Sequence, residues 1–270
     1  MPGKYTDDFF ELLSEGSLDS ARIVLPIIVD ILDPQSVIDV GCGQGAWLSI
    51  LKELGVPQVL GIDGDYINRD KLKISEHEFR VQDLSQPLSI KQTFDLVMSL
   101  EVAEHISEEK SDEFIKSLTS LGKVILFSAA IPGQGGTDHV NEQWPSYWME
   151  KFISHGYLPV DCIRERVWSD EKVMYWYAQN ILIFAQKDYL KSCPQLFYEY
   201  EKQVPIRPDL VHPKNYWDKC QEVSRLQELV GWYKSQCDPK KMLLKDFLMA
   251  APTVFLNGIS RTFSVFFTRS

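Results

Sequence analysis

Two glutamates and two histidines are the residues of this sequence best suited to acid–base chemistry. Glu101, Glu104 and His105 stand together in the segment Glu-Val-Ala-Glu-His. His139 follows in a long polar loop, from which it could reach the same region. If the chain turns helical after residue 100, the spacings i, i+3 and i+4 place the first three on one helix face. A hydroxyl group is a poor nucleophile until a base or a metal ion activates it. These side chains could act as the base or as ligands of the metal ion.

A glycine-rich turn follows a short β-branched run near the N-terminus. Glycine stands at every second position, 41, 43 and 45, and the helical-looking segment 46–54 comes next. A glycine backbone can approach a ligand closely because it carries no side chain, and the first N–H groups of the following helix point at the same place. A second strand ends about 18 residues later in Asp63, the separation expected for a carboxylate that binds ribose hydroxyls. These segments predict a nucleoside-binding crevice in an α/β fold.

The spacing of the three glycines differs from the dinucleotide fingerprint, which has two residues between its second and third glycines. Here Asp-x-Gly-x-Gly-x-Gly, residues 39–45, resembles motif I of the class I S-adenosylmethionine (SAM)-dependent methyltransferases. The resemblance continues in order through Gly-Ile-Asp-Gly-Asp at 61–65 (motif II), the segment 79–84 that would hold adenine, and 94–105 (motif IV). It covers roughly residues 35–186.

The resemblance implies SAM as cofactor and assigns residues to it. The glycines would surround the methionine portion of SAM, Asp39 would help to fix its ammonium group, and Asp63 would accept hydrogen bonds from the ribose diol. Asp83 would meet the adenine amino group with Leu84 beside the ring, although a turn residue after a strand is the alternative for Asp83. The predicted cofactor-binding residues are Asp39, Gly41, Cys42, Gly43, Gly45, Asp63, Gly64, Asp83, Leu84, Leu100 and Glu101.

The chemistry at the acceptor has two interpretations. The Glu-x-x-Glu-His stretch with a later histidine resembles the divalent-cation site of small-RNA ribose 2′-O-methyltransferases, which implies Mg²⁺ or Mn²⁺ held by Glu101, Glu104, His105 and His139. Against this, one more residue separates His139 from its tryptophan than in that family, and no basic RNA-binding surface is evident. Many methyltransferases of quinone and other small-molecule pathways carry Glu-Val-x-Glu-His without a metal, in acid–base or structural roles. His139, His105 and Glu104 are the catalytic candidates in either case.

The long loop 128–148 is expected to contribute to the acceptor site. It is rich in Gly, His, Asn, Glu and Trp, and it follows a strand, at the edge where open α/β sheets bind ligands. Trp144, Tyr147 and Trp148 could form an aromatic wall of this site, or they could be core residues at helical spacing. Pro145 marks an expected helix start.

Apolar periodicity predicts the elements that would position these groups. Strands that alternate with helices indicate a parallel, doubly wound sheet. The expected fold is α/β, with a Rossmann-like seven-stranded sheet and a helical N-terminal lid of the kind common in this family. The predicted elements are two short helices within 7–32, strands near 36–40, 59–63, 78–82, 94–100 and 122–128, helices near 46–54 and 107–121, and an antiparallel hairpin of 157–166 with 179–186.

The predicted alternation of strands and helices ends after residue 187. We expect a methyltransferase domain at 1–187, with its core at 35–186, and a helical C-terminal extension at 188–270 with helices at 188–202 and 216–235. The last 32 residues carry five basic residues against the single acid Asp246, together with many apolar ones. This composition is compatible with a membrane-surface helix. Packing on the core or on a second subunit of a homodimer is the alternative.

Bulk composition narrows the class of protein. The 270 residues are 44% hydrophobic, as in a soluble globular protein, and the N-terminus lacks the apolar region of a signal peptide. Five widely spaced cysteines form no disulfide framework or zinc knuckle, so a cytoplasmic location is expected. A formal net charge of −10 disfavours nucleic acid as a partner, because binding it usually requires a basic face.

The leading functional hypothesis is an O-methyltransferase that acts on a hydroxyl of a sugar, a glycan or another small polar metabolite. A cation-dependent ribose methyltransferase acting on RNA is the first alternative. A catalytically silent SAM-fold protein that binds partners through its C-terminal helices is the second.

Overall fold

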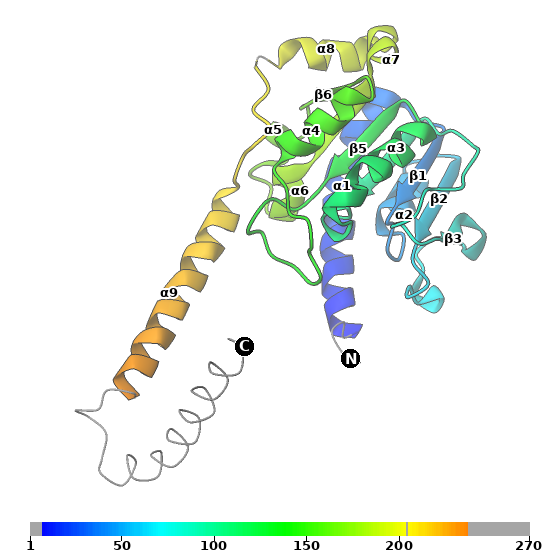
Figure 1. The fold of residues 1–270 in the computed structure, drawn as a ribbon. Helices are drawn as coiled ribbons and strands as arrows, with labels where there is room; N and C mark the ends of the chain where they lie inside the picture. Colours follow the sequence, from blue (N-terminus) through cyan, green and yellow to red (C-terminus); the bar gives the residue numbers. More distant parts are fainter. Residues whose placement is uncertain (1–6, 204, 237–270) are drawn as a thin grey trace, which may run out of the picture. The chain divides into compact units, whose positions relative to one another are not determined.

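A computed structural model describes residues 7–203 and 205–236 of the chain (Figure 1). A seven-stranded sheet runs in the order β3-β2-β1-β4-β5-β7-β6. All neighbouring strands pair in parallel except β7, which is antiparallel to both β5 and β6. The predicted Rossmann-like α/β fold is confirmed. The strands are β1 (Ser36–Val40), β2 (Gln58–Asp63), β3 (Phe79–Val81), β4 (Leu96–Leu100), β5 (Val124–Ser128), β6 (Tyr157–Val160) and β7 (Leu182–Gln186).

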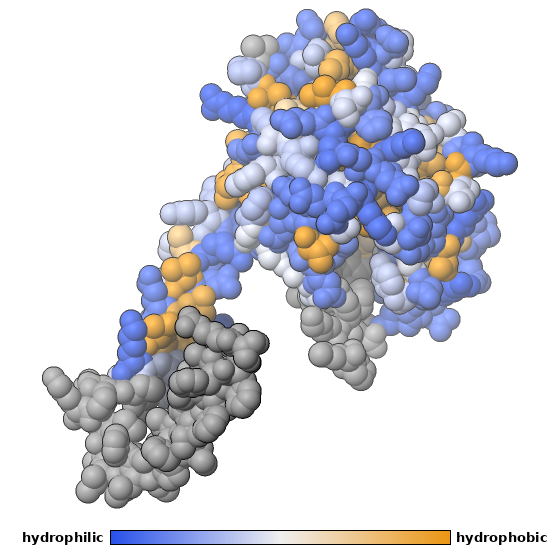
Figure 2. All heavy atoms as spheres, in the orientation of Figure 1, coloured by the Kyte–Doolittle hydropathy of each residue, from blue (hydrophilic) through white to orange (hydrophobic). Residues whose placement is uncertain are grey.

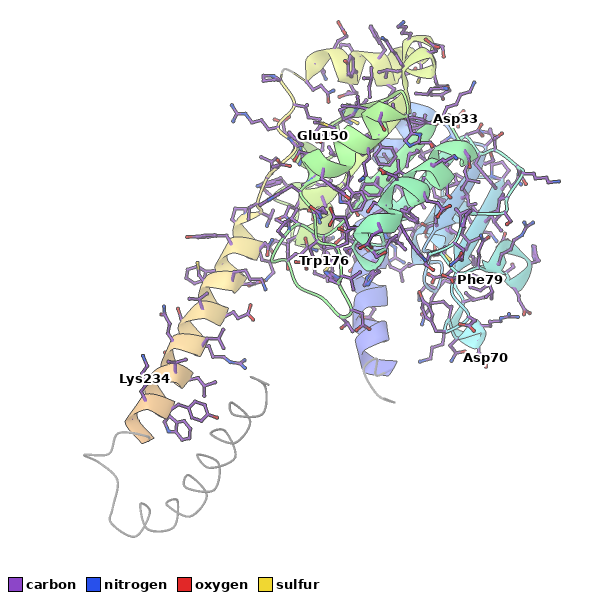
Figure 3. All side chains as sticks on the ribbon, in the orientation of Figure 1. Asp33, Asp70, Phe79, Glu150, Trp176 and Lys234 are labelled. Carbon is purple, nitrogen blue, oxygen red and sulfur yellow. The ribbon has the colours of Figure 1, made fainter. Side chains whose placement is uncertain are left out.

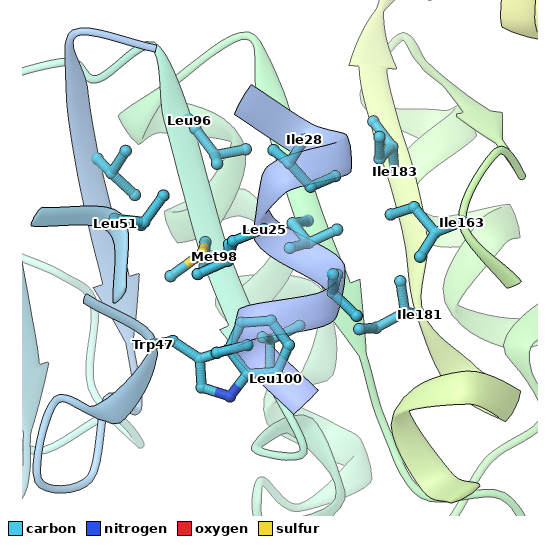
Figure 4. Close-up of a cluster of buried hydrophobic side chains, with 14 of the residues drawn as sticks. Leu25, Ile28, Trp47, Leu51, Leu96, Met98, Leu100, Ile163, Ile181 and Ile183 are labelled. Atoms are coloured by element: carbon cyan, nitrogen blue, oxygen red, sulfur yellow. The ribbon is translucent and has the colours of Figure 1, made fainter. Parts of the chain in front are cut away.

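Side-chain alternation along the strands divides the core between the two faces of the sheet. On β1, Val37 packs on one face and Ile38 on the other, and both are fully buried. Helices α1 (Asp7–Leu32) and α2 (Ala46–Glu53) cover the first face, where Leu25, Trp47 and Met98 meet (Figure 4). Helices α3 (Ser111–Leu121) and α4 (Pro145–Ser154) cover the second face.

Parallel pairing brings the carboxyl ends of three strands to one edge of the sheet. Asp39 on β1 lies opposite Gly61 on β2 and Met98 on β4. The turns that follow these strands therefore start side by side, which places the glycine turn, Asp63 and the segment after Leu100 at one location.

The first helix differs from the prediction. Residues 7–32 form the single helix α1, not two short ones. Gly16 stays helical within it, and a Cβ at that position would lie 2.7 Å from Cε of Met174. A close helix crossing therefore explains this glycine better than a chain break does. Ser17 and Ser20 of α1 also bond to Tyr177 and to the Met174 backbone N–H, which ties α1 to the segment before β7. The predicted lid role of this helix stays a prediction.

The hairpin and the segment after it are also more helical than predicted. Residues 157–160 and 182–186 pair as expected, but α5 (Arg164–Val167) and α6 (Tyr175–Asn180) occupy ranges assigned to the strands or the loop between them. The expected helix 188–202 is interrupted at Cys193-Pro194, because proline cannot donate a hydrogen bond within a helix. It is divided into α7 (Lys187–Ser192) and α8 (Pro194–Lys202). Short 3₁₀ helices lie at Arg69–Lys71, Glu76–Glu78, Ala103–His105 and Glu108–Lys110.

The chain divides into two compact units, residues 1–215 and 216–270. This division lies later than the boundary expected at 187, and Leu190 of α7 and Leu196 of α8 are buried in the core of the first unit. Helix α9 (Pro213–Gln236) exposes large side chains such as Leu226 and Trp232. Orange hydrophobic residues lie along this helix in Figure 2. Among the described helices, none is long and apolar enough to cross a membrane. The basic apolar tail lies outside the described residues.

A buried arginine links the segment after α8 to the rest of the first unit. The Arg164 side chain is 1% exposed and donates two hydrogen bonds to the carboxylate of Asp161, at 3.0 and 2.6 Å. It also donates to the carbonyl oxygens of Gln179, Arg207 and Pro208. One guanidinium therefore satisfies five acceptor contacts from three segments of the chain.

We predict that Arg164→Met lowers the free energy of unfolding by about 3 kcal/mol, because it leaves the carboxylate and three carbonyls without their donor. Urea denaturation followed by circular dichroism measures this loss. Arg166→Met is the matched control, because Arg166 forms a partly exposed ion pair with Glu199 that should contribute less than about 1 kcal/mol. Equal unfolding midpoints for the two variants would contradict the role assigned to Arg164.

Candidate active site

The glycine turn after β1 depends on conformations and space that other residues lack. Gly41, Gly43 and Gly45 have φ of 88°, 54° and 80°, in the left-handed region that favours glycine. A Cβ on Gly41 would lie 2.3 Å from the side chain of Val102, and one on Gly45 would lie 2.9 Å from that of Ile74. Gly43 has open space beside it. Bare backbone therefore forms this turn, and its predicted contact with SAM stays a prediction.

Asp63 joins the end of β2 to the glycine turn. The carboxylate accepts hydrogen bonds from the N–H groups of Gly43 and Gly64, each at 2.7 Å, and from the hydroxyl of Tyr66. It is 4% exposed. Sequence reasoning missed Tyr66, whose ring covers Gly64 so closely that a Cβ there would collide with it. Besides the predicted contact with ribose, Asp63 thus holds the two turns together.

A second carboxylate lies behind the first. Asp39 is 3% exposed, and its burial, together with the charge of Asp63, raises its pKa to about 7. Two buried carboxylates make this part of the site attractive to a cation, and the ammonium group of an amino acid is such a cation. Cys42 lies between them and Gly61, and burial raises the pKa of its thiol. A small side chain that fills space is the simplest account of this cysteine.

The residues predicted around adenine are less constrained. Asp83 is exposed and accepts a hydrogen bond from the Ser85 N–H at 2.9 Å. Its interactions with the Ser85 side chain and then with this N–H lower its pKa. This is the turn geometry of the alternative interpretation. Leu84 is half-buried on the second core cluster, and Leu100 is buried in the first. The contacts of Asp83 and Leu84 with adenine stay predictions.

Glu101 does not share a helix face with Glu104 and His105, contrary to the sequence expectation. Its φ is 55°, and the helical turn begins only at Ala103. The carboxylate instead accepts hydrogen bonds from the side-chain amides of Gln134, at 2.9 Å, and Asn180, at 3.1 Å. Burial raises its pKa, while these amides oppose the shift. Glu101 is therefore held toward the loop and α6.

Glu104, His105 and His139 do come together. Each offers one ligand atom, and these three atoms lie within 4.8 Å of one another. Nε2 of His139 is 3.9 Å from Oε1 of Glu104, and the two imidazoles meet edge to face with centroids 4.9 Å apart. The Glu104 side chain is 1% exposed, and neither of its carboxylate oxygens has a hydrogen-bond partner among the described residues. Burial and the charge of Glu101 raise its pKa well above the usual range.

Both imidazoles of this cluster are oriented through the same ring nitrogen. Nδ1 of His105 lies 3.3 Å from the carbonyl oxygen of Asp138, and Nδ1 of His139 lies 2.8 Å from Oε1 of Glu142. When Nδ1 donates, Nε2 carries the free lone pair. One carboxylate and two such nitrogens form a donor set suited to a divalent metal ion. Within the described residues, this trio excludes Glu101, the fourth predicted ligand.

The aromatic residues after the loop divide between core and surface. Trp148 is 1% exposed and packs against Phe127, so the aromatic-wall interpretation is wrong for it. Tyr147 is half-buried, and its hydroxyl donates to Ser111. Trp144 is 39% exposed at the start of α4, where Pro145 is the first residue as expected.

Comparison with known proteins supports the methyltransferase interpretation of the sequence motifs. A family model described as a methyltransferase domain matches residues 17–160, just over half of the chain. The chain belongs to the methyltransferase domain family. It is a SAM-dependent enzyme with the Rossmann-like fold predicted from its motifs. No curated protein matches its sequence.

Several solved structures resemble the methyltransferase at low sequence identity. The sugar N-methyltransferase KedS8 from Streptoalloteichus sp ATCC 53650 is 12% identical, with 69% of this chain and 96% of that chain covered and a TM-score of 0.51. The methyltransferase domain of bacterial CtHen1-C is 18% identical, with 63% and 98% covered and a TM-score of 0.47. Magnesium protoporphyrin IX methyltransferase (ChlM) from Synechocystis PCC 6803, with bound SAH, is 17% identical, with 69% and 90% covered and a TM-score of 0.47. At these identities the likeness concerns the fold alone.

We predict that Asp63→Ala weakens SAM binding at least tenfold, because it removes charge-assisted hydrogen bonds worth about 1.5–3 kcal/mol. Isothermal titration calorimetry measures the change. Asp70→Ala is the matched control, because Asp70 is exposed in the short helix Arg69–Lys71 outside these motifs, and this variant should bind SAM normally. Unchanged affinity in Asp63→Ala would show that the carboxylate does not bind the ribose.

A pH dependence follows from the raised pKa of Asp39. Its carboxyl is mostly protonated below about pH 7 in the free enzyme, so the charge that would bind the SAM ammonium group appears as pH rises through this value. We predict that SAM affinity increases several-fold between pH 6 and pH 7.5. Asp39→Asn should bind SAM more weakly and lose most of this increase. The same pH slope in both proteins would assign the titration to another group.

Proposed function

We propose that this methyltransferase transfers the methyl group of SAM to a hydroxyl of a sugar or another small polar metabolite. The cluster of Glu104, His105 and His139 is the observation that carries the proposal. It begins four residues after β4, at the sheet edge that also holds the glycine turn. The side chain of Val102 lies against Gly41. Burial and the charge of His139 lower the pKa of His105, and the charge of Asp63 is among the effects that oppose this shift. Groups able to activate a hydroxyl therefore adjoin the pocket predicted for the methyl donor.

The two halves of the site would divide the work of an in-line displacement. Asp39, Asp63 and the glycine backbone hold the donor, so that its methyl group faces the cluster. The acceptor hydroxyl must lie about 3 Å from that methyl group and opposite the departing sulfur. Among the described residues, His105 and His139 offer nitrogen lone pairs that could accept the hydroxyl proton. Loop residues 129–143 form the wall from which the acceptor would be positioned.

The donor set of the cluster also fits a divalent cation. Both oxygens of Glu104 are buried without a hydrogen-bond partner among the described residues, and a cation would satisfy them. Glu104, His105 and His139 would hold it, and their two imidazole nitrogens suit a transition-metal ion better than Mg²⁺. A bound cation supplies Lewis acidity that lowers the pKa of a hydroxyl. Under this proposal, Glu104, His105 and His139 determine where the acceptor oxygen lies.

The charge of the protein supports a small acceptor. With 38 acidic against 28 basic residues, a polyanion would meet net repulsion at long range. A ribose at an RNA end is the second candidate, because its vicinal hydroxyls could engage the same cluster. Since the cluster suits both acceptors and the net charge opposes RNA, we favour the sugar or small metabolite.

Transfer of labelled methyl from SAM to a panel of acceptors tests the proposal. The panel contains free sugars, nucleotide sugars, an amino sugar and a short single-stranded RNA, each with EDTA and with Mn²⁺. We expect O-methylated sugar or polyol products that Mn²⁺ stimulates. Methylation of the amine alone would contradict a hydroxyl acceptor, and methylation of RNA alone would establish the second candidate.

We predict that His139→Ala lowers kcat at least 100-fold and leaves SAM affinity within twofold, because general acid–base groups typically contribute at least that factor. Radiometric turnover and calorimetry measure the two effects. His155→Ala is the control, since His155 is exposed just after α4 and should not affect either quantity. Full activity in His139→Ala would remove this histidine from the mechanism.

A further inference from the structure

A single carboxylate organises the loop that carries His139. Oε2 of Glu142 accepts a hydrogen bond from the N–H of Gly133 at 2.7 Å. Oε1 accepts one from the N–H of Gly135 at 2.7 Å, and it lies 2.8 Å from Nδ1 of His139. The side chain of Glu142 is 19% exposed, so these contacts form in a partly desolvated setting. Three hydrogen-bonding groups thus converge on one side chain.

The backbone of this loop would not adopt its path without such an anchor. Gly133, Gly135 and Asp138 have φ of 80°, 77° and 58°, so three residues out of six take the left-handed conformation. That conformation offers no regular ladder to the N–H groups, and a polar side chain must satisfy them instead. A carboxylate provides two acceptor oxygens for the purpose, whereas a glutamine amide provides one oxygen and a donor group.

The same contact decides which nitrogen of His139 is available. Glu142 is an acceptor, so Nδ1 carries the hydrogen that it donates, and Nε2 keeps its lone pair. Nε2 points into the cluster, 3.9 Å from Oε1 of Glu104. The ring also needs the bare backbone of Gly136, because a Cβ there would lie 2.2 Å from Nε2. The glutamate on one side and the glycine on the other therefore fix the imidazole.

We propose that Glu142 is a positioning residue that holds His139 with Nδ1 protonated and with Nε2 directed at the Glu104 carboxylate. Glu142 contacts neither Glu104 nor His105 in the structure, and it acts through His139. The inference rests on the proposed function, because it gives the histidine of that site its orientation. In metal sites, a carboxylate behind a histidine raises the basicity of the ligand, and its loss typically weakens metal binding by about 10–100-fold.

The test uses the full-length protein and the variants Glu142→Gln and Glu142→Ala. The first readout is the His139 tautomer, from long-range ¹⁵N–¹H correlation spectra of histidine-labelled protein at pH 8, with His139→Ala to assign the signals. We expect Nδ1–H in the wild type and a mixture or Nε2–H in both variants. The second readout is Mn²⁺ affinity by calorimetry, which should fall at least tenfold while SAM affinity stays within twofold.

Glu150→Gln is the matched control. Glu150 is exposed on α4, away from the loop contacts (Figure 3), and its loss should leave the His139 tautomer and Mn²⁺ affinity unchanged. A wild-type tautomer retained in Glu142→Ala would overturn the inference. A tautomer lost in both variants, in a wild-type protein that binds no Mn²⁺, would uphold it and reject the metal in the proposed function. Failure of the inference about Glu142 and failure of the proposed metal site therefore give different results.

Discussion

The bonds from Asp63 to the Gly43 and Gly64 N–H groups are the interaction on which the rest of the site depends. Parallel pairing of β1 with β2 brings the ends of these strands together, but the pairing alone does not fix the path of the turns beyond them. One buried carboxylate does so by accepting an N–H from each turn. The glycine turn can then hold three left-handed residues with no side chain between its backbone and a ligand. The pocket predicted for the methyl donor is therefore built largely from main chain.

The part of the site predicted for the acceptor consists instead of side chains, and most of them lie on irregular segments. Glu101 follows β4, Gln134 and His139 lie in the long loop after β5, and Asn180 ends α6. Buried amides connect these segments, since Gln179 bonds to Asn180 and Gln134 and also accepts from the N–H of His212. Such a network is costly unless every member is satisfied. Here it extends from Glu101 to the segment after α8. Under the proposed function, the glycine turn would hold the cofactor and this network would shape the acceptor side.

Much of the fold and of the donor pocket could be predicted because each signal is local. Glycines at 41, 43 and 45 and the carboxylate that ends β2 follow directly from strand ends and turn chemistry. The acceptor side could be predicted only in part. His139 was found by residue type, but Glu142 was missed, because its contacts with Gly133 and Gly135 depend on the path of a loop that shows no periodicity.

The helical expectation for 101–105 was wrong for a related reason. The spacing of two glutamates and a histidine is the same whether the chain is helical or bent, and only the φ of Glu101 distinguishes the two. Similarly, Gly16 is helical because Met174 packs against it, a contact between residues far apart in the sequence. Pattern reasoning describes neighbours along the chain, and it does not include contacts of this kind.

Two buried glutamates, Glu101 beside the cluster and Glu104 within it, differ in how their negative charge is compensated. Burial of a carboxylate is unfavourable unless hydrogen bonds or an opposite charge compensate for it. Amide donors from Gln134 and Asn180 compensate Glu101. Glu104 receives no such donor among the described residues, and its charge is further disfavoured by that of Glu101. The fold thus satisfies one carboxylate and leaves the other with unused acceptor oxygens beside two imidazoles. A proton, a cation or a donor group of the acceptor would complete that arrangement, and under the proposed function each of these would take part in activating a hydroxyl.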